Sequence, residues 1–136
     1  PPGSITRRGL LLIISGPSGA GKTTITRAVE KAFPDSVFSV SATTRPRTAA
    51  DRDGIDYHFL SQADFDALIA DRAFIEHATY AGNRYGTLRA PVEAALAQGR
   101  LVILEIDVQG AIIVRAEFKD ALALFILPPS DTALLQ

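Results

Sequence analysis

The chain has 136 residues, of which 47% are hydrophobic, and its formal net charge is −1. This length predicts one domain, or a small core with an inserted subdomain, and the charge gives no indication of a nucleic-acid partner. The absence of cysteine from the chain excludes disulfides and thiolate metal sites. The first apolar run, 10–14, is too short to cross a bilayer, and no signal-peptide cleavage site follows it. We therefore expect no membrane partner and a cytoplasmic location; the sequence does not indicate an oligomeric state.

Strands and helices are predicted to alternate along most of the chain, after a disordered tail at 1–8. Apolar runs and apolar–polar alternation predict strands at 10–15, 36–40, 57–60, 74–80, 101–106 and 121–127. Helical spacing predicts helices at 22–33, 62–71, 90–98, 109–118 and after Ser130. The runs 10–15, 101–106 and 121–127 are almost continuously apolar, as is typical of parallel strands buried on both faces. An α/β fold follows, with a core at 9–35 and 90–136 and a mixed sheet with one helix inserted at 36–89.

The first predicted strand leads into a glycine-rich segment, Gly-Pro-Ser-Gly-Ala-Gly-Lys-Thr at 16–23, which matches the phosphate-loop pattern G-x-x-x-x-G-K-[ST]. Its glycines let the backbone approach phosphate oxygens closely, and the start of the following helix offers N–H groups to the anion. Lys22 is expected to reach the β- and γ-phosphates, and the Thr23 hydroxyl to ligate Mg²⁺. The candidate ATP-binding residues are Gly16, Pro17, Ser18, Gly19, Ala20, Gly21, Lys22, Thr23 and Thr24.

Two carboxylates follow the apolar run at 101–104. Strand alternation places Glu105 and Asp107 on one side of the chain, at the carboxyl end of a strand where α/β proteins bind ligands. In phosphate-loop proteins such a strand supplies an acid near the magnesium ion, which makes Glu105 a second candidate metal ligand. The alternative for Asp107, compatible with a binding role, is that it caps the next helix.

Two polar segments are ambiguous by themselves. The segment 41–47 carries Arg45 and Arg47, whose forks suit phosphate, but such a segment is usually a solvated turn. The segment 82–87 begins with Gly-Asn before an aromatic residue, a pattern that more often closes a hairpin than binds a ligand.

Taken together, these motifs resemble guanylate kinase over residues 9–136. The resemblance rests on Ser-Gly-Pro-Ser-Gly-Ala-Gly-Lys, Ser-Val-Ser-Ala-Thr-Thr-Arg, Asp-Gly-Ile-Asp-Tyr-His-Phe, Phe-Ile-Glu-His-Ala, Gly-Asn-Arg-Tyr-Gly-Thr, Glu-Ile-Asp-Val-Gln-Gly and Phe-Ile-Leu-Pro-Pro-Ser, in that order. It implies a nucleoside-monophosphate-kinase-like core in which 36–89 is a GMP-binding subdomain. The implied reaction transfers the γ-phosphate of ATP to GMP with Mg²⁺, giving ADP and GDP, in purine nucleotide metabolism.

The resemblance also assigns site residues by position. Lys22 and Arg45 would be catalytic, and the GMP-binding set would be Ser41, Arg45, Tyr57, Glu76, Tyr85, Gly86, Thr87 and Asp107. The role of Glu76 has a physical reason, because a carboxylate can accept from the adjacent N1–H and N2–H₂ donors of guanine, whereas adenine presents an acceptor at N1. Taken alone, Glu76 would be a solvent-facing strand residue, and Tyr57 and Tyr85 would be core aromatics.

The chain departs from the family pattern at two places. Thr48 stands where the family has a basic residue; Arg47 lies one position earlier, and its side chain is expected to point the other way. The arginine-rich lid and the last strand and helix of the family do not occur in these 136 residues, so uncovered apolar surface and slow phosphoryl transfer are expected of them alone. Two alternatives stay open: a kinase-like binding module that has lost the use of ATP, and a kinase for a phosphorylated sugar.

Overall fold

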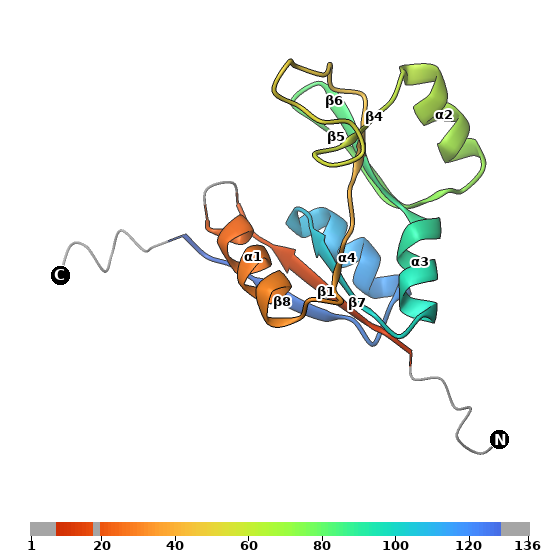
Figure 1. Cartoon of the computed structure of the whole chain (residues 1–136). Coiled ribbons are helices and arrows are strands. Elements are labelled where there is room, and N and C mark those ends of the chain that lie inside the picture. The colour runs from red at the N-terminus through yellow and green to blue at the C-terminus, as the bar shows by residue number, and fades with distance from the viewer. Residues whose placement is uncertain (1–7, 18–19, 129–136) are drawn as a thin grey trace. The chain divides into compact units, whose positions relative to one another are not determined.

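A computed structural model describes residues 8–17 and 20–128 and divides the chain into two compact units. Unit 1 comprises Pro1–Phe38 and Ala95–Gln136, and unit 2 comprises Ser39–Ala94. Figure 1 labels the helices of both units and all the strands except β2 and β3. Within the described ranges, no helix has the length and apolar character needed to cross a bilayer.

Unit 1 is built on a four-stranded, wholly parallel sheet in the order β2-β7-β1-β8. The strands are β1 (Leu10–Ser15), β2 (Val37–Phe38), β7 (Leu101–Glu105) and β8 (Leu122–Phe125). The helices are α1 (Lys22–Ala32), α4 (Val108–Glu117) and the last turn of α3 (Arg89–Ala97). The two central strands form the core, since Ile14 and Ile103 have no exposed surface and Ile25 and Val29 of α1 pack against them. The apolar runs therefore lie in the parallel sheet that the sequence predicted.

Unit 2 contains a smaller mixed sheet in the order β4-β3-β6-β5. Its strands are β3 (Ala42–Thr43), β4 (His58–Phe59), β5 (Phe74–Tyr80) and β6 (Asn83–Leu88), and its complete helix is α2 (Gln62–Ala70). β3 and β4 are parallel, whereas β3 with β6 and β5 with β6 are antiparallel. α2 begins at Ser61, whose hydroxyl accepts a hydrogen bond from the Asp64 N–H, and its Phe65 packs on Ala42 and Phe74.

The long predicted elements are confirmed, and the differences lie in short strands. The strands predicted at 36–40 and 57–60 each contain only two residues, Val37–Phe38 and His58–Phe59. The strands β3 and β6 were not predicted, because their segments are polar or contain glycine. They form strands by pairing with neighbouring strands. A hairpin, the more frequent role of the Gly-Asn pattern, is present, but its turn is formed by Ala81 and Gly82, and Asn83 already pairs with Tyr80. The helix predicted after Ser130 lies outside the described residues.

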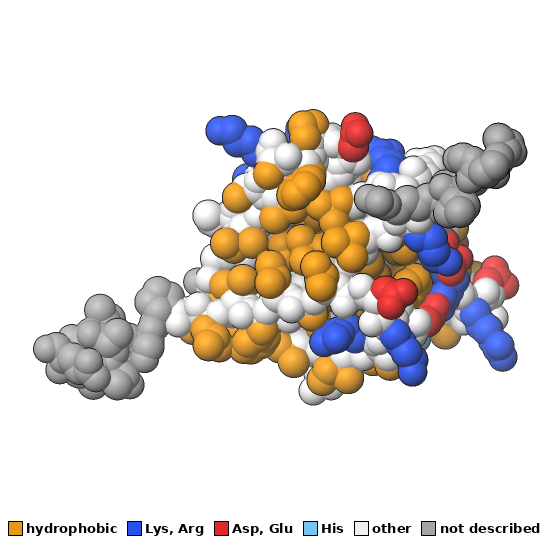
Figure 2. Space-filling model, turned by 90° about the horizontal axis from the view of Figure 1, so that it is seen from below, with side chains coloured by type: hydrophobic (Ala, Val, Ile, Leu, Met, Phe, Trp, Pro, Cys, Tyr) orange, Lys and Arg blue, Asp and Glu red, His pale blue; other side chains and the backbone are white. Residues whose placement is uncertain are grey.

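The segment 121–127 contains a strand, as predicted, but the prediction that this strand is buried is wrong. Among the described strands, β8 lies at the edge of the sheet and pairs with β1 alone, and all four of its residues are exposed. Large apolar side chains such as Phe125 (53% exposed) and Ile112 of α4 (62% exposed) stay in contact with solvent. Figure 2 shows hydrophobic side chains gathered over one face. The sequence of β8, Leu-Ala-Leu-Phe, is apolar throughout, although all four of its residues are exposed.

Candidate nucleotide-binding sites

The phosphate-loop segment of unit 1 leaves β1 by a turn that only glycine fits. Gly16 has a φ of +146°, and a Cβ at this position would lie 2.2 Å from the Ile126 carbonyl oxygen. The Lys22 ammonium donates to the Gly16 carbonyl at 2.8 Å, so the segment folds back on its own start. Pro17 and Ala20 are joined by a backbone hydrogen bond of 3.2 Å. Ser18 and Gly19 lie outside the described residues.

The N-terminus of α1 differs from those of α2 and α4. Ser61 and Asp107 cap α2 and α4 with side-chain oxygens, whereas α1 begins after Gly21, which has a φ of 97° and offers no side-chain cap. The first N–H groups of a helix have no partner within the helix, and a cap normally satisfies one of them. Without a cap, the first turn at Lys22, Thr23 and Thr24 can donate to an anion.

Glu105 ends β7 and is held by two threonines of α1. The Thr23 hydroxyl donates to Glu105 Oε1 at 3.0 Å, and the Thr26 hydroxyl donates to Oε2 at 2.8 Å. The structure thus brings together the two residues predicted as metal ligands. A carboxylate and a hydroxyl are hard oxygen donors of the kind that Mg²⁺ accepts beside substrate phosphates, so this pair fits the ion. Sequence reasoning missed Thr26; the available signal was its place one helical turn after Thr23.

Asp107, also in unit 1, caps α4. Its Oδ1 accepts a hydrogen bond from the Gly110 N–H at 2.8 Å, and the residue is exposed. The capping alternative is therefore confirmed. A contact of Asp107 with guanine stays a prediction.

In unit 2, Glu76 and Thr87 form a buried pair on neighbouring strands. They face each other in the register of β5 and β6, and the Thr87 hydroxyl donates to Glu76 Oε2 at 2.8 Å. Glu76 is 9% exposed and Thr87 is fully buried, so the alternative of a solvent-facing glutamate is wrong. The register shifts between Phe74 and Glu76, and the strand buries three successive residues there, Phe74 to Glu76, instead of alternating.

The backbone beside this pair is tightly packed. A Cβ at Gly86 would lie 2.6 Å from the ring of Phe74, so packing requires a glycine at this position. Ser41 directly precedes β3, and its carbonyl accepts a hydrogen bond from the His58 N–H at 2.9 Å. Gly86 thus lies in the same small sheet as Glu76, and Ser41 lies just before the start of one of its strands.

The three residues predicted to hold a phosphate also lie together in unit 2. The Arg45 guanidinium carbon lies 5.2 Å from the centre of the Tyr57 ring, and the Tyr57 and Tyr85 rings are 5.8 Å apart. Both tyrosines are half-buried, so part of each ring is packed in the interior, as expected of a core aromatic residue. Arg45 lies against the ring of Tyr57. The cluster combines a cation with two phenols, all of which are donors suited to phosphate.

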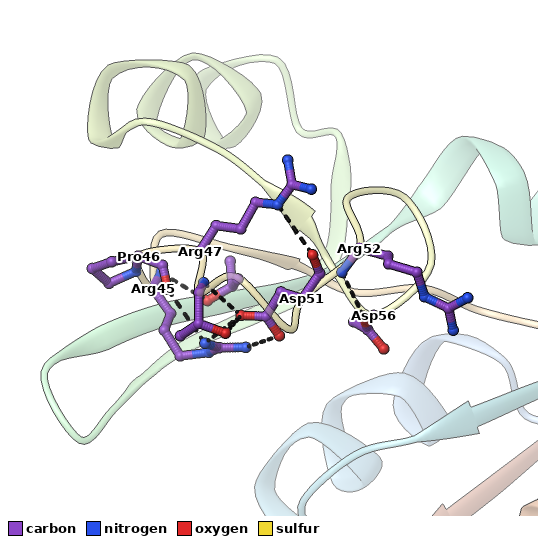
Figure 3. A network of polar contacts seen from close by, with 8 residues as sticks. Arg45, Pro46, Arg47, Asp51, Arg52 and Asp56 are labelled. Carbon is purple, nitrogen blue, oxygen red and sulfur yellow. Dashed lines mark hydrogen bonds and ion pairs between the residues drawn. The ribbon is translucent and has the colours of Figure 1, made fainter.

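Arg45 makes a two-pronged ion pair with Asp51, drawn in Figure 3. Asp51 Oδ2 accepts from Nη1 at 3.1 Å and Oδ1 accepts from Nη2 at 3.2 Å. The Thr48 N–H and hydroxyl both donate to Oδ2 at 2.8 Å. Hydrogen bonds from Arg45 and Thr48 hold the pKa of Asp51 well below its ordinary value, and the bond to Asp51 raises the pKa of Arg45. Neither Asp51 nor the part played by Thr48 was predicted from the sequence.

Arg47 is directed differently from Arg45. Its Nε donates to the backbone carbonyl of Asp51 at 3.2 Å, whereas Arg45 binds the carboxylate of the same residue (Figure 3). The sequence expectation compared Arg47 with position 48, and Thr48 contacts the Asp51 carboxylate while Arg47 contacts the Asp51 carbonyl. Whether Arg47 can replace the missing basic residue stays a prediction.

The parallel sheet, the uncapped first helix and the Thr23–Glu105 pair define an α/β protein with the phosphate-loop kinase fold. The family model described as guanylate kinase matches residues 8–136, and the chain belongs to this family. It is 50% identical over 127 residues to a guanylate kinase of Anaeromyxobacter dehalogenans and 50% identical over 129 residues to one of Clostridium perfringens. These alignments cover 93% and 95% of the chain but 56% and 60% of the relatives, so the chain spans little more than half of their length.

Among solved structures, a guanylate kinase from Anaplasma phagocytophilum has the same fold, with a TM-score of 0.77 and 33% sequence identity. That alignment covers 94% of this chain and 64% of the other.

Proposed function

We propose that the protein is an ATP:GMP phosphotransferase in which unit 1 binds ATP and unit 2 binds GMP. The observation that carries the proposal is the buried Glu76–Thr87 pair. A carboxylate removed from water and held by a neighbouring hydroxyl suits a ligand with two adjacent N–H donors. Guanine offers such donors at N1 and N2, whereas adenine offers an acceptor at N1 and would leave the carboxylate partly unpaired.

The ATP part of the proposal rests on the phosphate-loop segment. The uncapped N–H groups at the start of α1 would bind phosphate oxygens, and Lys22 would exchange the Gly16 carbonyl for the β- and γ-phosphates. Thr23 and Glu105 would hold Mg²⁺, which neutralises phosphate charge when bound.

The GMP phosphate would bind to Arg45, Tyr57 and Tyr85. In the transfer, an oxygen of this phosphate forms a bond to the γ-phosphorus of ATP while the bond to the β,γ-bridging oxygen breaks, giving GDP and ADP. Lys22 and Arg45 would offset the negative charge on the phosphates, which is the main protein contribution to reactions of this class. By family membership we also propose a place in purine nucleotide metabolism and a cytoplasmic location, where these nucleotides occur.

Calorimetric titration with ATP, GMP and AMP tests the binding part of the proposal. GMP is expected to bind at least tenfold more tightly than AMP to unit 2, an order-of-magnitude difference for one mismatched donor–acceptor pair. Equal affinities for GMP and AMP would contradict the proposal. Release of ADP that depends on GMP, measured on the complete gene product, tests transfer. Binding of GMP without any use of ATP would instead favour the kinase-like binding module.

A further inference from the structure

Contacts with neighbouring residues hold one edge of the Arg45 guanidinium in place. Asp51 occupies the end formed by Nη1 and Nη2, and Nη1 also donates to the Pro46 carbonyl at 3.3 Å. The guanidinium carbon lies over the rings of Tyr57 and Phe59, at 5.2 and 5.4 Å from their centres. These contacts restrain the guanidinium both in its plane and across it.

The other edge is left for a ligand. A guanidinium has five N–H donors, and the contacts with Asp51 and Pro46 account for three of them in Arg45. The Nε–H and the second Nη2–H, which lie side by side, make no hydrogen bond with the described residues. The Arg45 side chain is 27% exposed, so solvent reaches it. Two parallel N–H groups match two oxygens of a phosphate.

Asp51 is itself held in place. Three hydrogen bonds, from Arg45 Nη1 and from the N–H and hydroxyl of Thr48, converge on its Oδ2. Thr48 therefore anchors the carboxylate that orients the arginine. A carboxylate with this many donors stays ionised over the neutral pH range, so its charge is available to Arg45 under those conditions.

We propose that Asp51, anchored by Thr48, is a positioning residue that presents the Nε–Nη2 edge of Arg45 to the phosphate of the nucleoside monophosphate. The proposal rests on the proposed function, since it concerns the same phosphate. Asp51 does not touch the ligand; it acts through Arg45. Thr48, which stands where the family has a basic residue, would act by holding Asp51 in place.

Binding of GMP and of guanosine to the protein and its Asp51→Asn variant tests the proposal. The amide keeps the size of the carboxylate but loses its charge and one acceptor. It is expected to raise the Kd for GMP by about tenfold, the lower range for a charge-assisted contact, and to leave the Kd for guanosine unchanged. Asp51→Glu is expected to restore most of the affinity, and Thr48→Val to give a smaller loss because the backbone N–H still holds Asp51.

Asp56→Asn is the matched control. Asp56 lies in the same loop and accepts from the Arg52 N–H, but it does not contact Arg45, so its substitution is expected to leave both affinities unchanged. A further readout is the Nε–H proton resonance of Arg45, assigned by its absence in Arg45→Lys. It is expected to shift with GMP and not with guanosine.

Each other outcome overturns the proposal in a distinguishable way. Tighter GMP binding by Asp51→Asn would mean that the carboxylate competes with the phosphate for Arg45. Equal losses for GMP and guanosine would mean that Asp51 only maintains the fold, and an unchanged Kd would mean that it has no part in binding. Failure of the unmodified protein to bind GMP would refute the proposed function and this inference together.

Discussion

Thr26 and Glu105 are 79 positions apart in the sequence, and the threonine hydroxyl donates to Glu105 Oε2 at 2.8 Å. Thr26 is 3% exposed, so this bond joins the inner face of α1 to the end of β7. Thr23 holds the other oxygen of the same carboxylate, on the more exposed side. One carboxylate therefore has an inner contact that is structural and an outer, more exposed contact with Thr23, the other predicted metal ligand.

Thr26→Val is expected to lower the free energy of unfolding by about 1–2 kcal/mol, because the variant keeps the side-chain shape but leaves a carboxylate oxygen without its donor. Urea denaturation measures the change. Thr23→Val is the matched control, since Thr23 is exposed and its loss is expected to reduce Mg²⁺-ATP affinity more than stability. If both variants lose the same stability, the division into an inner and an outer contact is wrong.

Lys22→Ala is expected to weaken ATP binding by about 2 kcal/mol or more, the value for a hydrogen bond to a charged group, while GMP binding is nearly unchanged. Lys22 belongs to unit 1, whereas the predicted GMP residues other than Asp107 belong to unit 2. Calorimetry with each nucleotide measures both affinities. A parallel loss of the two would show that the nucleotides do not bind independently.

Glu76→Gln is expected to weaken GMP binding by about 2 kcal/mol, because one guanine donor then faces an amide NH₂. The affinity for AMP is expected to change much less, since AMP lacks the pair of donors. Thermal unfolding of the variant serves as the control for the buried position. Unchanged GMP affinity in a folded variant would refute the assignment of Glu76 as the guanine reader.

Ala81→Asn is expected to stabilise the protein by about 0.5–1 kcal/mol, measured by urea denaturation. Ala81 and Gly82 connect β5 to β6 with φ values of 52° and 80°, a turn with both central residues in the left-handed region. Asparagine tolerates this conformation better than alanine does. Valine tolerates the left-handed conformation worse than alanine, so Ala81→Val is expected to destabilise the protein. A valine variant more stable than the asparagine variant would contradict the turn assignment.

The ion pair of Asp51 predicts a dependence of stability on pH. The pKa of Asp51 is lower in the folded protein than its ordinary value of about 4, so the folded state favours the ionised carboxylate. This contribution is complete above the unfolded-state pKa and is lost as the pH falls through the folded-state pKa. The stability difference between the protein and Asp51→Asn is therefore expected to be constant near neutral pH and to shrink below about pH 4. Urea midpoints from pH 7 to pH 3 measure it, and a difference that grows on acidification would show the opposite sign of the shift.

The sequence by itself determined the parallel core and the positions of the candidate residues. The apolar runs at 10–15 and 101–106 are buried in any compact arrangement, and the spacing of the phosphate-loop segment is local, so both follow from neighbouring residues. The pairing of Thr23 with Glu105 was also predictable, because the phosphate-loop segment leads from the carboxyl end of β1 to the start of α1, and the carboxyl end of the parallel strand β7 lies at the same edge of the sheet.

Only the tertiary structure decided the contacts that depend on pairing and burial. β3 and β6 exist because neighbouring strands supply their hydrogen bonds, and a register shift in β5 buries Glu76 opposite Thr87. The Asp51 carboxylate meets Arg45 because the loop between β3 and β4 folds back on itself, with Thr48 as its anchor. Such contacts arise from long-range pairing and from the path of an irregular loop, which side-chain periodicity along the chain does not encode.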